Sequence, residues 1–271
     1  MKKLKVLLTF LFLISLLTGC LQVETNVTVE KDGSGIISER VLFSKTFIAM
    51  VKDFIEAFQD SASTEEFSMF DESKIKTDAL SFGEGVEYVS HEIIKDDGWE
   101  GYQATYEFKD ITKVKLTPDP ESKVDLDNSE TPAAPEDYYF FSFVKGEVAE
   151  LIIDRPELEF EGGTADEDTD STQIAENDDE GAEEFIKLME GMKIEVSVEV
   201  EGEIVNTNAS YVQGSKVMLF QMDLSEMMKN KEAFKDFKKN EPQNIDELKL
   251  YIEKLQGLKI QVEKPVIIKF E

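Results

Sequence analysis

The chain has 271 residues, with 58 acidic and 29 basic side chains and a formal net charge of −29. So large an acidic excess disfavours nucleic acid and bare anionic lipid surfaces as partners. A hydrophobic content of 41% is enough for a buried core, and a single cysteine excludes a disulfide within the monomer.

The start of the chain has the pattern of an export signal. Three lysines lie within the first five residues, and an apolar run follows from Val6 to Leu17. A membrane-spanning helix needs about 20 apolar residues, and this run is shorter. Residues 1–19 are therefore predicted to be a signal peptide that is removed, and not a permanent span.

The end of this signal resembles the bacterial lipobox, in the sequence Leu17-Thr18-Gly19-Cys20. The resemblance implies cleavage between Gly19 and Cys20, an S-diacylglycerol thioether on the thiol, and an N-acyl chain, such as palmitate, on the new amine. Two or three chains of this kind hold a protein stably on a bilayer. We expect a protein anchored on the exported side of the bacterial envelope, in the cell membrane or the outer membrane.

The first folded elements are predicted to be a hairpin and a helix. Apolar and polar residues alternate over 22–29 and again over 36–43, and 31–35 has the chemistry of a turn. Ser44 is a suitable N-cap, and apolar residues then recur at helical spacing as far as residue 58.

The middle of the chain predicts more antiparallel strands. Residues 86–94 and 101–108 flank one turn, and 138–144 and 148–153 flank another. Two further short elements are expected, a helix near 65–70 and a strand over 111–116.

Two polar segments interrupt this part of the chain. Residues 117–136 contain four prolines and are predicted to form a flexible loop. Acidic residues are concentrated over 157–184, and 162–181 has no aromatic residue, so we expect a disordered acidic insertion at 162–181.

The last third mixes strands and helices. The expected strands are 193–200, extended by 204–205, then 216–222, 258–262 and 266–270; the expected helices are 182–189, 224–228 and 245–255. The whole order predicts an α+β fold of residues 20–271, a mostly antiparallel sheet of hairpins with amphipathic helices packed on one face.

Few residues are candidates for chemistry. His91 is the only histidine, and it lies on a predicted strand with no obvious partner for catalysis. Asp166, Asp168 and Asp170 have the spacing that begins a calcium loop, but Ser171 stands where such a loop needs glycine. We therefore expect no catalytic residue, no metal site and no cofactor.

Two apolar features leave alternatives open. Trp99, in a predicted turn, could clamp that turn or serve as an anchor for a ligand. The late methionines could line an adaptable groove or fill the core. They are Met189, Met192, Met218, Met222, Met227 and Met228.

Two stretches together resemble the LppM-type lipoprotein domain. One is Cys20 followed by Val23, Val27, Val29 and Asp32-Gly33-Ser34-Gly35; the other is Ile194 to Val200 with Gly202, Ile204-Val205, Thr207-Asn208, a turn at Gly214 and the strand 216–222. The family often has proline where this chain has Glu201, and tryptophan where it has Leu219-Phe220. The resemblance implies an α+β fold and a lipid or glycolipid role.

Three functions follow as hypotheses. The first is a membrane-anchored, non-enzymatic envelope lipoprotein that binds an apolar or amphiphilic, lipid-like ligand or a partner protein. The second is a structural or assembly lipoprotein with no small-molecule ligand, whose acidic segment is a spacer or docking tail. The third, an enzyme, is disfavoured by the scarcity of catalytic groups.

Overall fold

The structure is a computed structural model that describes residues 21–58, 70, 72–119, 138–158, 160, 191–240 and 242–271. Several predicted features lie outside these residues. They are the signal peptide with Gly19 and Cys20, the helix near 65–70 apart from Phe70, most of the loop 117–136, the acidic insertion 162–181 with its aspartates, and the helix 182–189.

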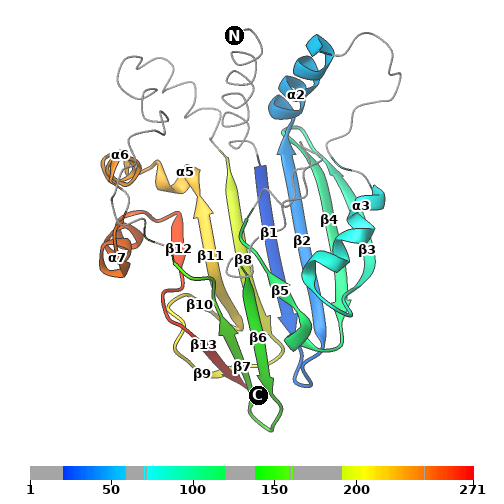
Figure 1. The fold of residues 1–271 in the computed structure, drawn as a ribbon, viewed down its shortest axis with the longest axis vertical. Coiled ribbons are helices and arrows are strands. Elements are labelled where there is room, and N and C mark those ends of the chain that lie inside the picture. Colours follow the sequence, from blue (N-terminus) through cyan, green and yellow to red (C-terminus); the bar gives the residue numbers. More distant parts are fainter. Residues whose placement is uncertain are drawn as a thin grey trace.

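The described residues form two sheets (Figure 1). The large sheet has the order β10-β11-β8-β1-β2-β4-β3, and β12 pairs with β11. Its strands are β1 (Leu21–Val29), β2 (Gly35–Ser44), β3 (Glu87–Lys95), β4 (Trp99–Phe108), β8 (Lys193–Val200), β10 (Val212–Gln213), β11 (Lys216–Asp223) and β12 (Leu258–Ile260).

The small sheet has the order β5-β6-β7-β13-β9. Its strands are β5 (Lys115–Leu116), β6 (Tyr139–Val144), β7 (Ala149–Asp154), β9 (Ile204–Thr207) and β13 (Val266–Phe270). Pairing within the sheets is antiparallel except between β1 and β8, which confirms an α+β fold with mostly antiparallel strands.

The three predicted hairpins are confirmed as β1–β2, β3–β4 and β6–β7. In the first hairpin, Gly33 has a φ of 89°, which a residue with a side chain adopts only with strain, and the Ser34 amide donates to Asp32 Oδ1 over 3.0 Å. Local turn chemistry therefore fixes the register that places Leu21 opposite Phe43.

The parallel pairing of β1 with β8 was not predicted. It places Gln22 opposite Lys193 and Val29 opposite Val200, so two strands more than 160 residues apart in sequence lie at the centre of the large sheet. This long-range pairing joins the first hairpin to the last third of the chain.

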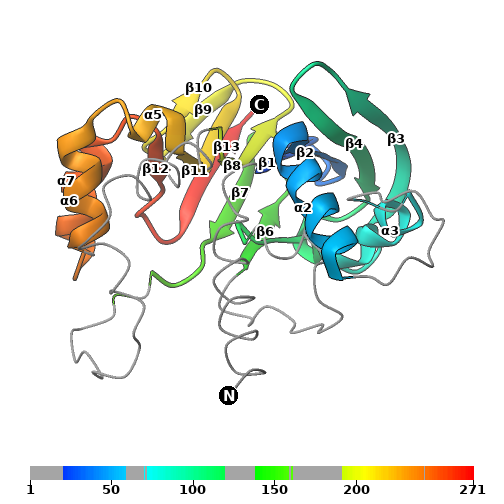
Figure 2. The same cartoon turned by 90° about the horizontal axis from the view of Figure 1, so that it is seen from above.

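The inner faces of the two sheets share one apolar core, and Figure 2 shows β6 and β7 of the small sheet below β1 and β8 of the large one. Val27, Ile37 and Val198 of the large sheet and Leu151 and Ile268 of the small sheet are all completely buried there. A second apolar cluster lies at the β11 edge, where helices pack on the ends of β8, β11 and β12.

The helices are spread around the sheets (Figures 1 and 2). α2 continues from the end of β2, α3 lies beside β3, and the last three lie at the opposite edge. Their bounds are α2 (Lys45–Phe58), α3 (Glu72–Thr77), α5 (Leu224–Met227), α6 (Lys231–Lys239) and α7 (Ile245–Lys254). The predicted packing of the helices on one face is therefore not shown.

Helix ends follow the expected capping chemistry. The hydroxyl of Ser44 accepts from the Phe47 amide at 3.1 Å, as expected for the N-cap of α2. Asn230 and Asn244 cap α6 and α7 in the same way. α6 was not predicted. No helix among the described residues is long and apolar enough to cross a membrane.

Two predictions about strands were wrong. Residues 204–205 do not extend β8: the chain turns at Gly202, whose φ is 117°, and Glu203 and Glu271 exchange backbone hydrogen bonds, which starts β9 in the other sheet. Residues 111–116 are not one strand. Asp110 caps a short 3₁₀ helix, η3 (Ile111–Lys113), and β5 follows it.

Candidate functional site

The connection between the predicted lipid anchor and the folded domain is as short as it can be. β1 begins at Leu21, the residue after Cys20, and Leu21 is only 4% exposed and pairs with Phe43. Adjacent Cα atoms are about 3.8 Å apart, so no linker separates the thiol-bearing residue from the sheet. Cys20 and the cleavage site after Gly19 themselves lie outside the described residues.

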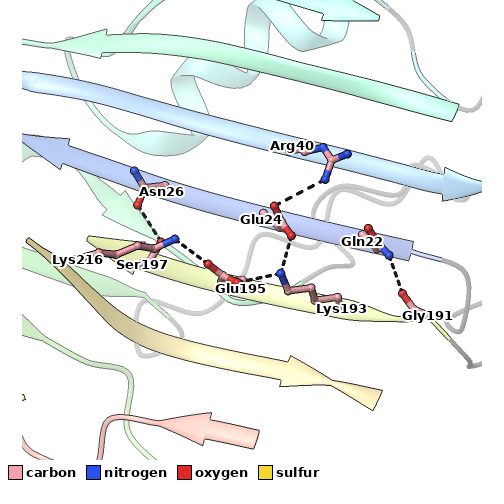
Figure 3. Close-up of polar contacts among 9 residues, drawn as sticks. All are labelled: Gln22, Glu24, Asn26, Arg40, Gly191, Lys193, Glu195, Ser197 and Lys216. Atoms are coloured by element: carbon pink, nitrogen blue, oxygen red, sulfur yellow. Dashed lines mark hydrogen bonds and ion pairs between the residues drawn. The ribbon is translucent and has the colours of Figure 1, made fainter. Parts of the chain in front are cut away.

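A row of charged side chains crosses the outer face of the large sheet beside this point (Figure 3). Lys193 Nζ lies 2.6 Å from Glu24 Oε1 and 3.0 Å from Glu195 Oε2. Lys216 Nζ lies 2.9 Å from Glu195 Oε1. Acids and bases therefore alternate along the row across β1, β8 and β11. Because they alternate, its carboxylates and ammonium groups neutralise one another.

The row is partly buried, and burial changes the pKa values of its charged groups. The Glu195 side chain is only 11% exposed, and burial opposes its ionised form, but the hydrogen bonds from Lys216 and Lys193 outweigh that cost and lower its pKa. Burial likewise opposes the charge of Lys193, and its carboxylate partners outweigh it and raise the pKa. We interpret this charged row as a cross-link that fixes the parallel β1–β8 contact.

Neutral side chains continue the row in both directions (Figure 3). Ser197 Oγ donates to Asn26 Oδ1 at 2.9 Å, and Gln22 Nε2 donates to the Gly191 carbonyl at 3.2 Å. The second hydrogen bond links the start of β1 to the residues just before β8.

The inner face carries a buried acid that the sequence analysis missed. Glu39 of β2 is completely buried, lies opposite Thr25, and its Oε2 accepts from the Tyr102 hydroxyl at 3.3 Å. Burial, and then the nearby Glu39 carboxylate, raise the pKa of Tyr102. The available signal was position: Glu39 alternates with Ile37 and Val41, so it lies on the apolar face of its strand.

His91 has partners that the sequence did not reveal. Its Nδ1 lies 2.6 Å from the Tyr88 hydroxyl, and its Nε2 lies 3.7 Å from Glu72 Oε2. Tyr88 comes from the same strand, where a bulge between Tyr88 and Ser90 breaks the alternation, and Glu72 comes from α3. The imidazole thus joins α3 to the edge strand β3. The alternation of the sequence could not predict either contact, because one depends on a bulge and the other on a residue of a different element.

Trp99 and two of the methionines pack against neighbouring residues. Trp99 is the first residue of β4 and is half-buried, and a side chain added at Gly191 would meet its ring at 3.3 Å, so the tryptophan packs directly over that glycine. Met192 and Met227 are buried in the second apolar cluster, which supports core filling for these two.

Exposed apolar side chains gather on the β6–β7 hairpin. Phe140, Val144 and Val148 are each at least two-fifths exposed, and Lys115 Nζ lies 4.3 Å from the centre of the Tyr138 ring. Tyr139 and Phe141 of the same strand are buried. No group of three or more potential metal ligands occurs among the residues described by the structure.

Comparisons with known proteins add a single distant likeness to this picture. No family model matches the chain, and no curated protein matches it. Among solved structures, it is similar to the NMR structure of the folded domain of the Mycobacterium tuberculosis LppM protein, with 12% identity and a TM-score of 0.30 over 77% of this chain and 85% of that chain. A likeness this weak carries no argument about function.

Proposed function

We propose that the chain is a lipid-anchored protein of the bacterial envelope that has no catalytic role and binds an apolar or amphiphilic, lipid-like ligand or a partner protein. The observation that carries the anchoring is the start of β1 at Leu21, next to the lipobox cysteine. A domain that extends away from the bilayer needs a flexible linker after its anchor. Here the chain passes directly from Cys20 into β1, a central strand of the large sheet.

The LppM-type resemblance belongs to this proposal. The two stretches that carry it, Val23 to Val29 and Ile194 to Val200, pair in parallel along their whole length. They therefore form one structural unit at the centre of the large sheet, which supports a shared architecture for residues that are far apart in sequence.

A binding role is supported by exposed apolar residues outside the core. Phe140, Val144 and Val148 present apolar surface that the core does not use. A structural or assembly role is the second candidate, because Tyr139 and Phe141 of the same hairpin are buried in the shared core and offer no surface to a ligand.

Anchoring is tested by the intact mass of the protein purified from bacterial membranes. We expect a chain that begins at Cys20 and carries the mass of a diacylglycerol and an additional acyl chain. The Cys20→Ala variant should lack these masses and leave the membrane fraction. A wild-type chain of unmodified mass would contradict the proposal.

Binding is tested by native mass spectrometry and lipid extraction on the acylated protein. A stoichiometric co-purifying lipid, beyond the covalent acyl chains, would support the ligand-binding role and identify the ligand class. A clean mass, with no lipid gained on incubation with an envelope extract, would favour the structural role and direct the search to protein partners.

A further inference from the structure

We propose that one end of the two-sheet domain is held against the bilayer, so that the protein stands on the membrane in a fixed orientation. This inference rests on the proposed lipid anchor at Cys20 and goes beyond it, because it names the surface that meets the lipid. The connection has no slack, because Leu21 is buried and paired with Phe43 of β2, one residue from the proposed acylated position.

The register of the strands identifies the membrane-facing end. Leu21 lies opposite Phe43, Ser44 lies opposite Trp99, and Gln22 lies opposite Lys193. The start of β1 therefore shares one end of the large sheet with the start of β4, the start of β8 and the end of β2, which leads into α2. Figure 1 shows α2 and α5 beyond this same end, which we call the anchor end.

Contacts among these elements make the anchor end rigid. The Lys45 amide donates to the Gly98 carbonyl at 2.9 Å, and the Leu224 amide donates to the Met192 carbonyl at 3.1 Å. The Gly191 amide also donates to Ser225 Oγ at 3.0 Å. A rigid end bonded directly to an acylated residue cannot rotate away from the bilayer as a tethered domain can.

Charge distinguishes the anchor end from the opposite, distal end. Among the residues that the structure describes, exposed charges around the starts of β1 and β4 balance: the bases are Lys45, Lys52 and Lys95, and the acids are Asp53, Asp96 and Asp97. The described residues of the distal end include more acids than bases. Its exposed acids include Glu30, Asp32, Glu87, Glu107, Asp110, Glu147, Glu201, Glu203 and Glu271, and its exposed bases include Lys31, Lys109, Lys113 and Lys145.

Distance from the bilayer determines how strongly the distal acids interact with anionic lipid. Negative lipid headgroups repel acids that lie within a Debye length, about 8 Å at physiological salt, and attract nearby lysines. β1 has nine residues, so the distal end is about 30 Å farther along the strands at about 3.3 Å per residue. The short connection thus holds the anchor end against the membrane and keeps the acids of the distal end well beyond a Debye length from it.

The test uses the full chain, acylated in a bacterial host and reconstituted into vesicles of phosphatidylethanolamine and phosphatidylglycerol that contain a headgroup nitroxide lipid. Cys20 is the only cysteine and its thiol is consumed by acylation, so an introduced cysteine takes a fluorophore selectively. Thr46→Cys places the label on the exposed face of α2 at the anchor end, and Lys31→Cys places it in the exposed turn at the distal end.

We expect the nitroxide to quench the label at position 46 strongly, and to leave the label at position 31 as bright as in vesicles without nitroxide. A further variant of the chain carries an insertion of about 20 glycine and serine residues between Cys20 and Leu21, a segment with a root-mean-square span of about 25 Å. With this linker, most of the quenching at position 46 should disappear.

The outcomes separate the two proposals. An intact mass without diacylglycerol overturns both the anchor and the orientation. An acylated chain with equal quenching at positions 46 and 31 overturns the orientation alone. Quenching at position 46 that survives the inserted linker overturns the role of the direct connection.

Discussion

The two faces of the large sheet bury glutamates in different ways. On the outer face, Glu195 is nearly buried but lies between Lys193 and Lys216. On the inner face, Glu39 lies in the apolar core, and a tyrosine hydroxyl donates to it. The outer acid is neutralised by charge and holds distant strands together, whereas the inner acid is accommodated by a neutral donor.

The face of the strand on which an acid lies therefore determines how its burial affects the free energy of unfolding. Both glutamates follow the period of two in their strands, and only the face to which each points differs. A substitution on the inner face should therefore change stability through packing and desolvation, and one on the outer face through ion pairs. The following predictions concern unfolding by urea of the unlipidated mature chain.

The largest effect is expected from the neighbouring isoleucines of β2. Ile37 is completely buried and Ile36 is 42% exposed on the opposite face. Ile37→Ala should lower the free energy of unfolding by about 3 kcal/mol, because it leaves a cavity in the shared core. Ile36→Ala, the matched control, should change it by about 0.5 kcal/mol or less. Equal effects would contradict the assignment of the faces.

The next effect comes from the donor to the buried acid. Tyr102→Phe should lower the free energy of unfolding by about 1–3 kcal/mol, because Glu39 loses the Tyr102 hydroxyl as a donor. Tyr138→Phe removes a hydroxyl from a half-buried ring and should be close to neutral. A neutral Tyr102→Phe variant would show that the hydroxyl contributes nothing to holding Glu39 in the core.

A smaller, pH-dependent effect is expected from Glu195. Its pKa is lowered in the folded state, so its contribution is present above its ordinary pKa, about 4.5, and is lost as the pH falls through the folded-state value. Glu195→Gln should lower the free energy of unfolding by about 1.5 kcal/mol at neutral pH, the scale of hydrogen bonds to charged groups.

The difference between Glu195→Gln and the wild type should shrink as the pH falls below about 4.5, because the carboxylate is then protonated first in the unfolded chain and, at lower pH, in the folded one. Glu92→Gln, at an exposed position of the edge strand, is the matched control and should show little difference at any pH. A Glu195 difference that stays constant with pH would mean that its ion pairs do not stabilise the sheet.

The smallest effect is expected at the rim of the same charged row. Arg40 lies 3.9 Å from Glu24, and both side chains are about one-third exposed. Arg40→Gln should change the free energy of unfolding by about 0.5 kcal/mol or less, and salt should reduce the difference further. An effect as large as that of Glu195→Gln would show that exposure does not rank these contacts.

The local elements follow from short-range patterns in the sequence. The hairpins, the Ser44 cap of α2 and the helix α7 depend on neighbours in the chain, because alternation, turn residues and caps act over a few positions. The lipobox interpretation, which suggests an anchored protein, is also local. The residues that it concerns lie outside the described structure, so it stays a prediction.

The long-range arrangement depends on contacts that form only in the folded chain. The parallel β1–β8 contact, the separate sheet that contains β9, and the partners of Glu39 and His91 join residues far apart in the chain or depend on a bulge. Outside the hairpins, local patterns contain no information about which strands meet, because any strand with one apolar face can pair with several others. The anchor end depends on both kinds of information. The sequence pattern predicts the anchor at Cys20, and the register of the large sheet identifies the residues that lie beside it.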